Sequence, residues 1–360
     1  MRNSEIARRS TCGALLLCAL PSIALAAEPV TLDNVVAPSA NAADEPLAAE
    51  FSLDSAVHFL DSAALDWQKS RNCLTCHTNY AYLMARPAVS ADSPQLATVR
   101  AYAEALITDR WPTDGPRWDA EVAMTAAMLA LNDAATSGTL HPLTRRALDR
   151  TWTTQREDGG FDWLKCDWPP MESDDHFGAT MVAIGVGAAP DGYVATPAAQ
   201  AGLSKLKAYF AANPAPMLHH RAMLLWANSY LPDLVTAEAR QATIDELLAL
   251  QKADGGWGLA TLGDWQRADG SPQDMESSDG YGTGFVIYVL RRAGIPAGDE
   301  RLARGIAWLK SHQRESGRWF TRSLHADSMH FITHAGTAFA VLALAECGAL
   351  PPAEATASAE

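Results

Sequence analysis

Two cysteines and a histidine form the most specific chemical pattern in the sequence, within the run Asn72-Cys73-Leu74-Thr75-Cys76-His77. Two thiols at this spacing can form thioether bonds to the vinyl groups of one haem, and the adjacent imidazole can then bind the iron as an axial ligand. The pattern therefore predicts a covalent haem c held by Cys73 and Cys76, with His77 on the haem iron. A structural disulfide or half of a zinc site is the alternative, but the sequence has no second Cys-x-x-Cys pair for zinc.

A second set of reactive side chains lies where predicted buried helices begin. Residues 171–179 align with residues 275–283, and the stretch that starts at residue 334 has the same register. Carboxyl, imidazole and phenol groups at such positions can bind a substrate or move a proton. The candidate catalytic residues are Glu172, Asp175, His176, Glu276, Asp279, Tyr281 and His334. We expect the haem to face this polar set, with His176 or His334 meeting the iron or its ligand.

These side chains also have ordinary structural explanations. Asp175 and Asp279 stand at predicted helix starts, where a carboxylate can cap free backbone N–H groups and suits the helix dipole. The histidines of the set can be buried with a backbone carbonyl as partner. Glu172 and Glu276 precede the caps and recur in two turns, which makes capping a weaker explanation for them. His219 and His220 also fall near the start of a predicted inner helix, but they can equally lie in a surface turn.

The first 27 residues predict a secretory signal peptide. Arg2, Arg8 and Arg9 precede an apolar run over residues 12–27 that contains Ala24-Leu25-Ala26. A basic start, a short apolar core and an Ala-x-Ala site are the features that export signals share. No other stretch approaches the roughly 18 apolar residues of a membrane span. We therefore expect a periplasmic or secreted protein with no transmembrane segment.

The mature chain that this signal predicts is acidic and has two cysteines outside the haem motif. The full sequence carries 28 Lys and Arg against 42 Asp and Glu, a formal net charge of −14. Such a surface repels nucleic acid and anionic lipid, and it indicates either basic partners or simple solubility. The expected partner is a small-molecule substrate or a redox partner protein. Cys166 and Cys347 form either a disulfide or two separate thiols, and the sequence leaves both arrangements open.

The elements that must position these residues are helical. Apolar residues recur every three or four positions, and Gly, Pro and Asp mark the turns. Three turns share one pattern, in which Gln is followed by three residues, Gly, one residue and an aromatic: Gln155 to Phe161, Gln251 to Trp257 and Gln313 to Trp319. We expect the Gln to close an outer helix, the Gly to adopt positive φ and the aromatic ring to pack between repeats.

Six pairs of helices are predicted on this basis. The outer helices lie near 55–68, 95–109, 141–155, 196–211, 236–251 and 299–313, and the inner, more apolar ones near 78–87, 119–131, 175–189, 217–230, 280–294 and 333–347. Six hairpins in two layers predict an all-α closed (α/α)6 toroid over residues 51–350, with an open solenoid as the alternative. Residues 28–50 and 351–360 are expected to be a disordered linker and a flexible tail.

The three Gln/Gly/aromatic turns resemble the QW motifs of squalene-hopene and oxidosqualene cyclases, and of the wider α/α-toroid group that includes the β subunit of protein prenyltransferases. The likeness covers roughly residues 55–348, and it implies the fold of terpenoid cyclases and prenyltransferases. The protonating Asp-x-Asp-Asp motif of the cyclases is absent from this sequence. Those enzymes also carry no haem motif, so the resemblance implies a fold and makes cyclase activity a weaker expectation.

Two classes of function follow from these observations. The first is an exported c-type haem protein with a redox role, either in electron transfer or as a haem-dependent oxidoreductase that acts in the central cavity. The second is a non-redox terpenoid cyclase-like or polysaccharide-processing enzyme, or a binding scaffold, in which the Cys-x-x-Cys-His run is structural. The export signal and the haem motif together favour the first class, and the sequence leaves open whether the protein is an enzyme.

Overall fold

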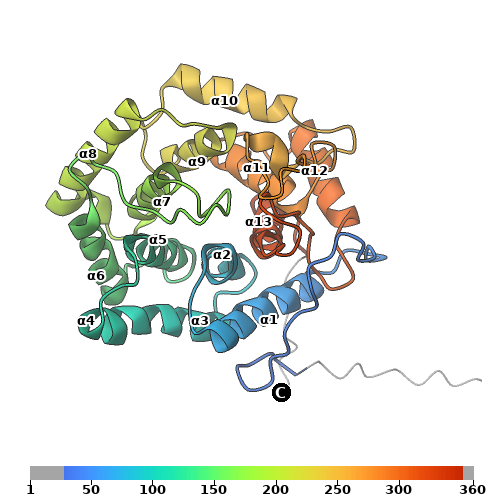
Figure 1. The fold of residues 1–360 in the computed structure, drawn as a ribbon, viewed down its shortest axis with the longest axis horizontal. Helices are drawn as coiled ribbons and strands as arrows, with labels where there is room; N and C mark the ends of the chain where they lie inside the picture. Colours follow the sequence, from blue (N-terminus) through green and yellow to red (C-terminus); the bar gives the residue numbers. More distant parts are fainter. Residues whose placement is uncertain (1–27, 352–360) are drawn as a thin grey trace, which may run out of the picture.

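The computed structural model describes residues 28–351, and most of this part of the chain is helical. The predicted signal peptide, 1–27, and residues 352–360 of the predicted tail lie outside the described residues. Within the described range, β structure is limited to isolated bridges. Figure 1 shows an inner ring of helices surrounded by an outer ring.

Six helix pairs build the two rings. The inner ring consists of α2 (Ala81–Ala85), which continues a π-helical turn (Cys76–Tyr80), α5 (Asp119–Ala135), α7 (Asp175–Ala188), α9 (Leu218–Asn228), α11 (Gly280–Arg292) and α13 (Ile332–Glu346). The outer ring consists of α1 (Leu53–Arg71), α3 (Pro94–Ala105), α6 (Pro142–Thr151), α8 (Pro197–Ala212), α10 (Ala237–Ala249) and α12 (Glu300–Ser311), with the short α4 (Trp111–Thr113) after α3. Helix α13 packs against α11 on one side and against α1 and α2 on the other. The predicted all-α, closed (α/α)6 toroid is therefore confirmed.

Local sequence explains where the outer helices begin. Ser52, Ser93, Thr196 and Asp299 each accept a hydrogen bond from the first turn of the helix that follows, which satisfies a backbone N–H that has no partner within the helix. Helices α3, α6 and α8 begin with proline, whose fixed φ suits the first helical position. The inner helices are buried on nearly every side because neighbours and the outer ring cover them.

The three Gln/Gly/aromatic turns join neighbouring repeats. Each Gln amide donates to the carbonyl of the Gly in its own turn. Each also donates to the next outer element, in bonds of 2.9 Å from Gln155 to Gly202, 2.7 Å from Gln251 to Arg301 and 2.8 Å from Gln313 to Ser52. The last of these bonds ties the sixth repeat to the first and closes the ring.

The glycine and aromatic positions of these turns behave as predicted. The three glycines have φ between +89° and +94°, a region that favours Gly. A Cβ atom on Gly317 would lie 2.1 Å from the carbonyl oxygen of Ser55 in α1. All three aromatic rings are fully buried, and the indole of Trp319 donates to a carbonyl of α12 at 2.7 Å.

Residues 28–50, expected to be a disordered linker, instead pack along the toroid. Arg318 is only 1% exposed, and its guanidinium donates to the Glu45 carboxylate, to the carbonyls of residues 39 and 40, and to the side-chain oxygen of Asn41. We call residues 38–48 the N-terminal strap. The composition of this segment did not predict the strap, because the strap is anchored by one buried cation, Arg318, which lies 273 positions after Glu45 in the chain.

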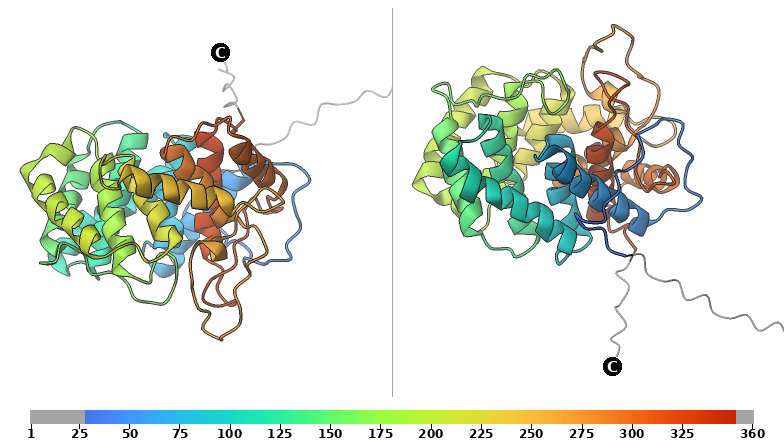
Figure 2. Two further views of the ribbon diagram at one scale, coloured as in Figure 1. Left: turned by 90° about the horizontal axis from the view of Figure 1, so that it is seen from above. Right: turned by 60° about the horizontal axis from the view of Figure 1, so that its bottom comes forward.

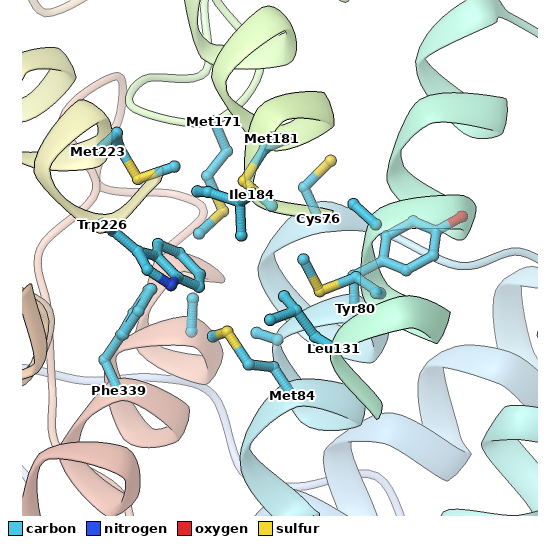
Figure 3. Close-up of a cluster of buried hydrophobic side chains, with 14 of the residues drawn as sticks. Cys76, Tyr80, Met84, Leu131, Met171, Met181, Ile184, Met223, Trp226 and Phe339 are labelled. Atoms are coloured by element: carbon cyan, nitrogen blue, oxygen red, sulfur yellow. The ribbon is translucent and has the colours of Figure 1, made fainter. Parts of the chain in front are cut away.

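Methionines fill the centre of the ring, where a central cavity was expected. The open space measures about 20 Å³, and its lining includes Met84, Met124, Met128, Met171, Met181, Met223, Cys76, Trp226 and Phe339. Figure 3 shows most of these side chains around that space. Unbranched thioether side chains adapt to irregular gaps, so the packed centre leaves room for about one water molecule.

The loops that lead into α7, α11 and α13 are long irregular segments, over residues 155–174, 263–279 and 312–331. Residues 263–279, which precede α11, project furthest from the body of the ring (Figure 2). The candidate residues predicted from the sequence all lie in these loops or in the first turn of an inner helix.

Candidate functional site

The Cys-x-x-Cys-His run forms the turn between α1 and the first inner helix. Asn72 follows α1 with φ +48°, and its N–H bonds to the Gln68 carbonyl at 3.0 Å. Asn tolerates this left-handed conformation, so it takes the place that Gly holds in the other turns. Cys73 is half-buried, Cys76 is 5% exposed, and both are free thiols. One turn therefore presents both thiols and the adjacent imidazole.

Two aromatic rings hold His77. The imidazole stacks on Phe331, with centroids 5.6 Å apart and an interplanar angle of 12°, and it meets the edge of Trp67 at 4.9 Å. Burial lowers the pKa of His77 to about 3. The ring is therefore neutral at physiological pH, which is the form that offers a lone pair to a metal.

His334, one of the predicted site residues, lies beside His77. The Thr78 hydroxyl is 2.8 Å from Nδ1 of His77 and 2.9 Å from Nδ1 of His334. The Nε2 atom of His334 is 3.3 Å from the side-chain nitrogen of Asn41 in the N-terminal strap. Burial, and then the neighbouring His77 and Arg318, lower the pKa of His334 to about 3. The structure thus joins His334 to the Nδ1 side of His77 through a shared hydroxyl.

Cys76 lies against a different part of the protein. Its thiol lies next to the carboxyl group of Glu172, and it lines the methionine-filled centre. Burial raises the pKa of the Cys76 thiol, and Glu172 raises it further. Burial also raises the pKa of Glu172. The thiol is therefore protonated at neutral pH and donates to the carboxyl group.

The donors of this turn fit a c-type haem. Two free thiols and a neutral imidazole are the groups that covalent attachment and iron ligation require. A cleft of about 310 Å³ opens next to the turn, lined by Trp67, Arg71, Phe331, His334 and the strap. On the Cys76 side the open space is about 20 Å³, and the methionine side chains there are the part of the wall that can adapt most easily.

A second cluster lies at the starts of α7 and α9. The Nε2 atom of His220 is 2.9 Å from the Asp174 carboxylate, and the His176 ring stands perpendicular to His220 with centroids 5.3 Å apart. The Nε2 atom of His219 is 3.0 Å from the Tyr281 hydroxyl. Each of the three histidines has one buried ring nitrogen with no hydrogen-bond partner among the described residues.

Burial keeps His176 and His219 of the second cluster neutral, while Asp174 is ionised. Burial alone would raise the pKa of Asp174, but the hydrogen bond and charge of His220 and the hydrogen bonds from Phe177 and Ser173 together lower it to about 2. Burial lowers the pKa of His176 to about 4 and that of His219 well below its ordinary value. An ionised carboxylate on one nitrogen of His220 orients that ring, and the opposite nitrogen is then available to a reacting group.

The three aspartates at the starts of α7 and α11 have structural duties. Asp279 caps α11 and Asp174 caps α7, each by accepting from the N–H three residues on. Asp175 instead accepts from the backbone N–H of Trp163 at 3.1 Å and from Arg156 at 2.7 Å, and so holds the preceding loop. The predicted capping role is therefore found at Asp279, whereas in α7 it falls on Asp174 rather than Asp175.

The predicted residues do not form a single site. His334 joins His77, while His176 and Tyr281 belong to the second cluster. Glu172 is half-buried beside Cys76, and Glu276 is exposed on its loop. Cys166 and Cys347 are separate free thiols, the first exposed and the second half-buried.

Two contributors, Thr78 and Asn41, were missed from the sequence because they carry no motif. The surface-turn alternative for His219 and His220 fails because both rings are fully buried. The sequence signal for His219 and His220 was their position in the helical repeat. They fall in the first turn of an inner helix, as His77, His176 and His334 do.

The rings, the turns and the closure between the last and first repeats define an α/α toroid of the terpene-cyclase kind. No protein-family model matches the sequence, and no curated protein sequence gives a significant match. No helix within residues 28–351 is long and apolar enough to cross a membrane.

Several solved structures have a fold similar to that of this chain. The ent-copalyl diphosphate synthase from Streptomyces platensis superposes on 75% of this chain with a TM-score of 0.50 and 18% identity, and this chain spans half of that enzyme. The type II terpene cyclase MstE from Scytonema covers 82% of this chain and 99% of its own length, with a TM-score of 0.48 and 12% identity. A glycosidase covers 76% of this chain and 87% of its own length, with the same TM-score and identity. Likeness at this identity establishes the fold alone.

Proposed function

We propose that this chain is an exported c-type haem protein with a redox function, built on a cyclase-like toroid. Cys73 and Cys76 would hold the haem through thioether bonds, and His77 would ligate the iron. The observation that supports this most directly is that one turn presents two free thiols beside an imidazole that burial keeps neutral. A bound haem c supplies one-electron chemistry.

The surrounding residues fix the orientation of the His77 ring. Trp67 and Phe331 restrict the plane of the His77 ring, and the Thr78 hydroxyl anchors its Nδ1 atom. Outer partners of this kind orient a ligating imidazole and tune its basicity. His334 contacts the Nδ1 side of His77, which favours a role behind the ligand rather than on the distal side of an iron.

A non-redox enzyme is the second candidate. The observation that favours it is the cluster of His176, His219 and His220, whose unpartnered buried nitrogens stand beside Asp174 and Tyr281. Among the described residues this cluster shares no hydrogen bond or ring contact with His77. It would handle protons in a substrate reaction whether or not haem is attached.

The first prediction tests haem attachment directly. Protein produced in a host with haem-attachment machinery should keep haem stain after denaturing electrophoresis, because thioether bonds survive denaturation. The double variant Cys73→Ala, Cys76→Ala should lose the stain. Cys166→Ala and Cys347→Ala, which change the other two free thiols, should keep it. Colourless wild-type protein with a disulfide between Cys73 and Cys76 would rule out the haem function and leave the second candidate.

A further inference from the structure

A continuous chain of hydrogen bonds connects the N-terminal strap to His77. Arg318 donates to the side-chain oxygen of Asn41 at 2.9 Å, and the side-chain nitrogen of Asn41 lies 3.3 Å from Nε2 of His334. The Thr78 hydroxyl then bridges the Nδ1 atoms of His334 and His77, at 2.9 Å and 2.8 Å. Arg318, Thr78 and His334 are all less than a tenth exposed, whereas Asn41 and His77 are half-buried. We call this chain the strap relay.

Arg318 fixes the direction in which the strap relay donates. A guanidinium only donates hydrogen bonds, so the Asn41 atom that it contacts is the carbonyl oxygen, and the NH2 group faces His334. An NH2 group also only donates, and Nε2 of His334 must therefore accept and carry no hydrogen. Neutral His334 then carries its hydrogen on Nδ1 and donates it to Thr78.

The direction of hydrogen-bond donation continues from Thr78 to His77. A hydroxyl has one hydrogen, and Thr78 already accepts from His334, so its hydrogen goes to Nδ1 of His77. The hydrogen of His77 therefore sits on Nε2. The Thr75 hydroxyl is 3.3 Å from both ring nitrogens of His77 and so does not distinguish the two tautomers. If both imidazoles donated to Thr78, its buried hydroxyl hydrogen would have no acceptor, which is an unfavourable arrangement.

We propose that Asn41, held by Arg318, is a positioning residue that sets the tautomer of His77. The N-terminal strap thereby determines which ring nitrogen of His77 is free. This inference rests on the proposed function, in which His77 would ligate the iron; because Thr78 occupies its Nδ1 atom, Nε2 would be the ligating nitrogen. The tautomer itself is a property of the chain without haem. In the described arrangement Nε2 is the protonated nitrogen.

The use of Nε2 as a ligand therefore requires a rearrangement of the strap relay. His77 must then carry its hydrogen on Nδ1 and donate it to Thr78. If the remaining hydrogens each shift by one position, Thr78 donates to Nδ1 of His334, and His334 carries its hydrogen on Nε2. Two donors, that N–H and the NH2 of Asn41, then face each other, so ligation at His77 loosens the contact of the strap at Asn41.

The test is Asn41→Asp in haem-free protein, made without attachment machinery and labelled with 15N on the histidine rings. A carboxylate at position 41 accepts from Nε2–H of His334 and still pairs with Arg318, so it reverses the strap relay. Long-range 15N–1H spectra should show the hydrogen of His77 on Nε2 in the wild type and on Nδ1 in the variant. His77→Gln and His334→Gln assign the two rings.

Asn34→Asp is the matched control, because it adds the same charge to the same N-terminal segment, where Asn34 bonds only to Thr31 and Pro29. It should leave the His77 tautomer unchanged. Asn41→Leu provides neither donor nor acceptor and should give a mixture of tautomers, which keeps the test decisive if the aspartate variant folds poorly.

A His77 that is protonated on Nδ1 in the wild type, or one that does not respond to Asn41→Asp in folded protein, would overturn the inference. Haem attachment is measured separately by staining. A reversed tautomer in a protein that never takes up haem overturns the proposed function alone, and attached haem with an unresponsive tautomer overturns the relay alone.

Discussion

At the scale of single residues, burial rather than residue type decides the chemistry of the histidines. The sequence identified His77 from its motif, and His176 and His334 from their register. It could not show that His334 shares a hydroxyl with His77, because Thr78 and Asn41 have no distinctive pattern. Contacts of this kind arise only when segments far apart in the sequence are brought together by the closed ring.

The second prediction concerns the acid stability of the protein. Burial lowers the pKa of His176 from 6.5 to about 4, so between these pH values the unfolded chain binds a proton that the folded chain does not. This contribution to stability is present above pH 6.5 and is lost as the pH falls towards 4. The loss is at most about 1.4 kcal/mol per pH unit.

His176→Gln keeps a polar side chain and removes this titration. Urea unfolding measured at several pH values from 7 to 4.5 should show a free energy of unfolding that falls less steeply in the variant, by up to one bound proton. His58→Gln is the control, because His58 is exposed on α1. An unchanged slope in the His176 variant would contradict the buried, neutral state of this ring.

At the scale of elements, the sequence predicted most of the fold. The twelve predicted helix ranges match the two rings to within a few residues at most ends, because apolar periodicity and turn residues are local signals. The Gln/Gly/aromatic turns were informative since each residue has its own physical role. The bond from each Gln to the following repeat was not predicted, because it joins residues about 50 or more positions apart.

The third prediction tests the turn that closes the ring. Gly317→Ala should destabilise the protein by about 3 kcal/mol or more, because the added Cβ would lie 2.1 Å from the Ser55 carbonyl oxygen and the two elements must separate. Gly138→Ala is the matched control, with φ +67° and nothing within 4 Å of its Cβ. It should lose only the roughly 1–2 kcal/mol of left-handed backbone strain. Equal losses in denaturant unfolding would show that the contact with Ser55 is not tight.

At the scale of the whole molecule, the N-terminal strap is the feature that the sequence concealed. Residues 28–50 are rich in Ala, Pro and acidic residues, a composition that normally indicates a solvated segment. Arg318 makes more of the strap's hydrogen bonds than any other residue does, and its side chain is buried within a turn that the sequence assigned to another role. The composition of a segment is an average over its residues, so it cannot reveal a single strong contact with a distant residue such as Arg318.

The fourth prediction measures that anchor. Glu45→Ala should destabilise the protein by about 3–5 kcal/mol, because it leaves the buried Arg318 cation without its counter-ion. Glu50→Ala, at an exposed position with no ion pair among the described residues, should change stability by less than about 0.5 kcal/mol. Thermal and denaturant unfolding compare the two variants. A small effect at Glu45 would show that the strap is not firmly docked.

The hydrogen bond from Gln313 to Ser52 also has a consequence for how the chain acquires its structure. The two residues are 261 positions apart. The first repeat therefore cannot pack against the sixth until nearly the entire polypeptide is available. Contacts of such long sequence separation form slowly, since the intervening chain must be ordered first. During synthesis α1 and α2 are therefore left with an uncovered apolar side, on which newly made chains are open to aggregation and to exchange of repeats between molecules.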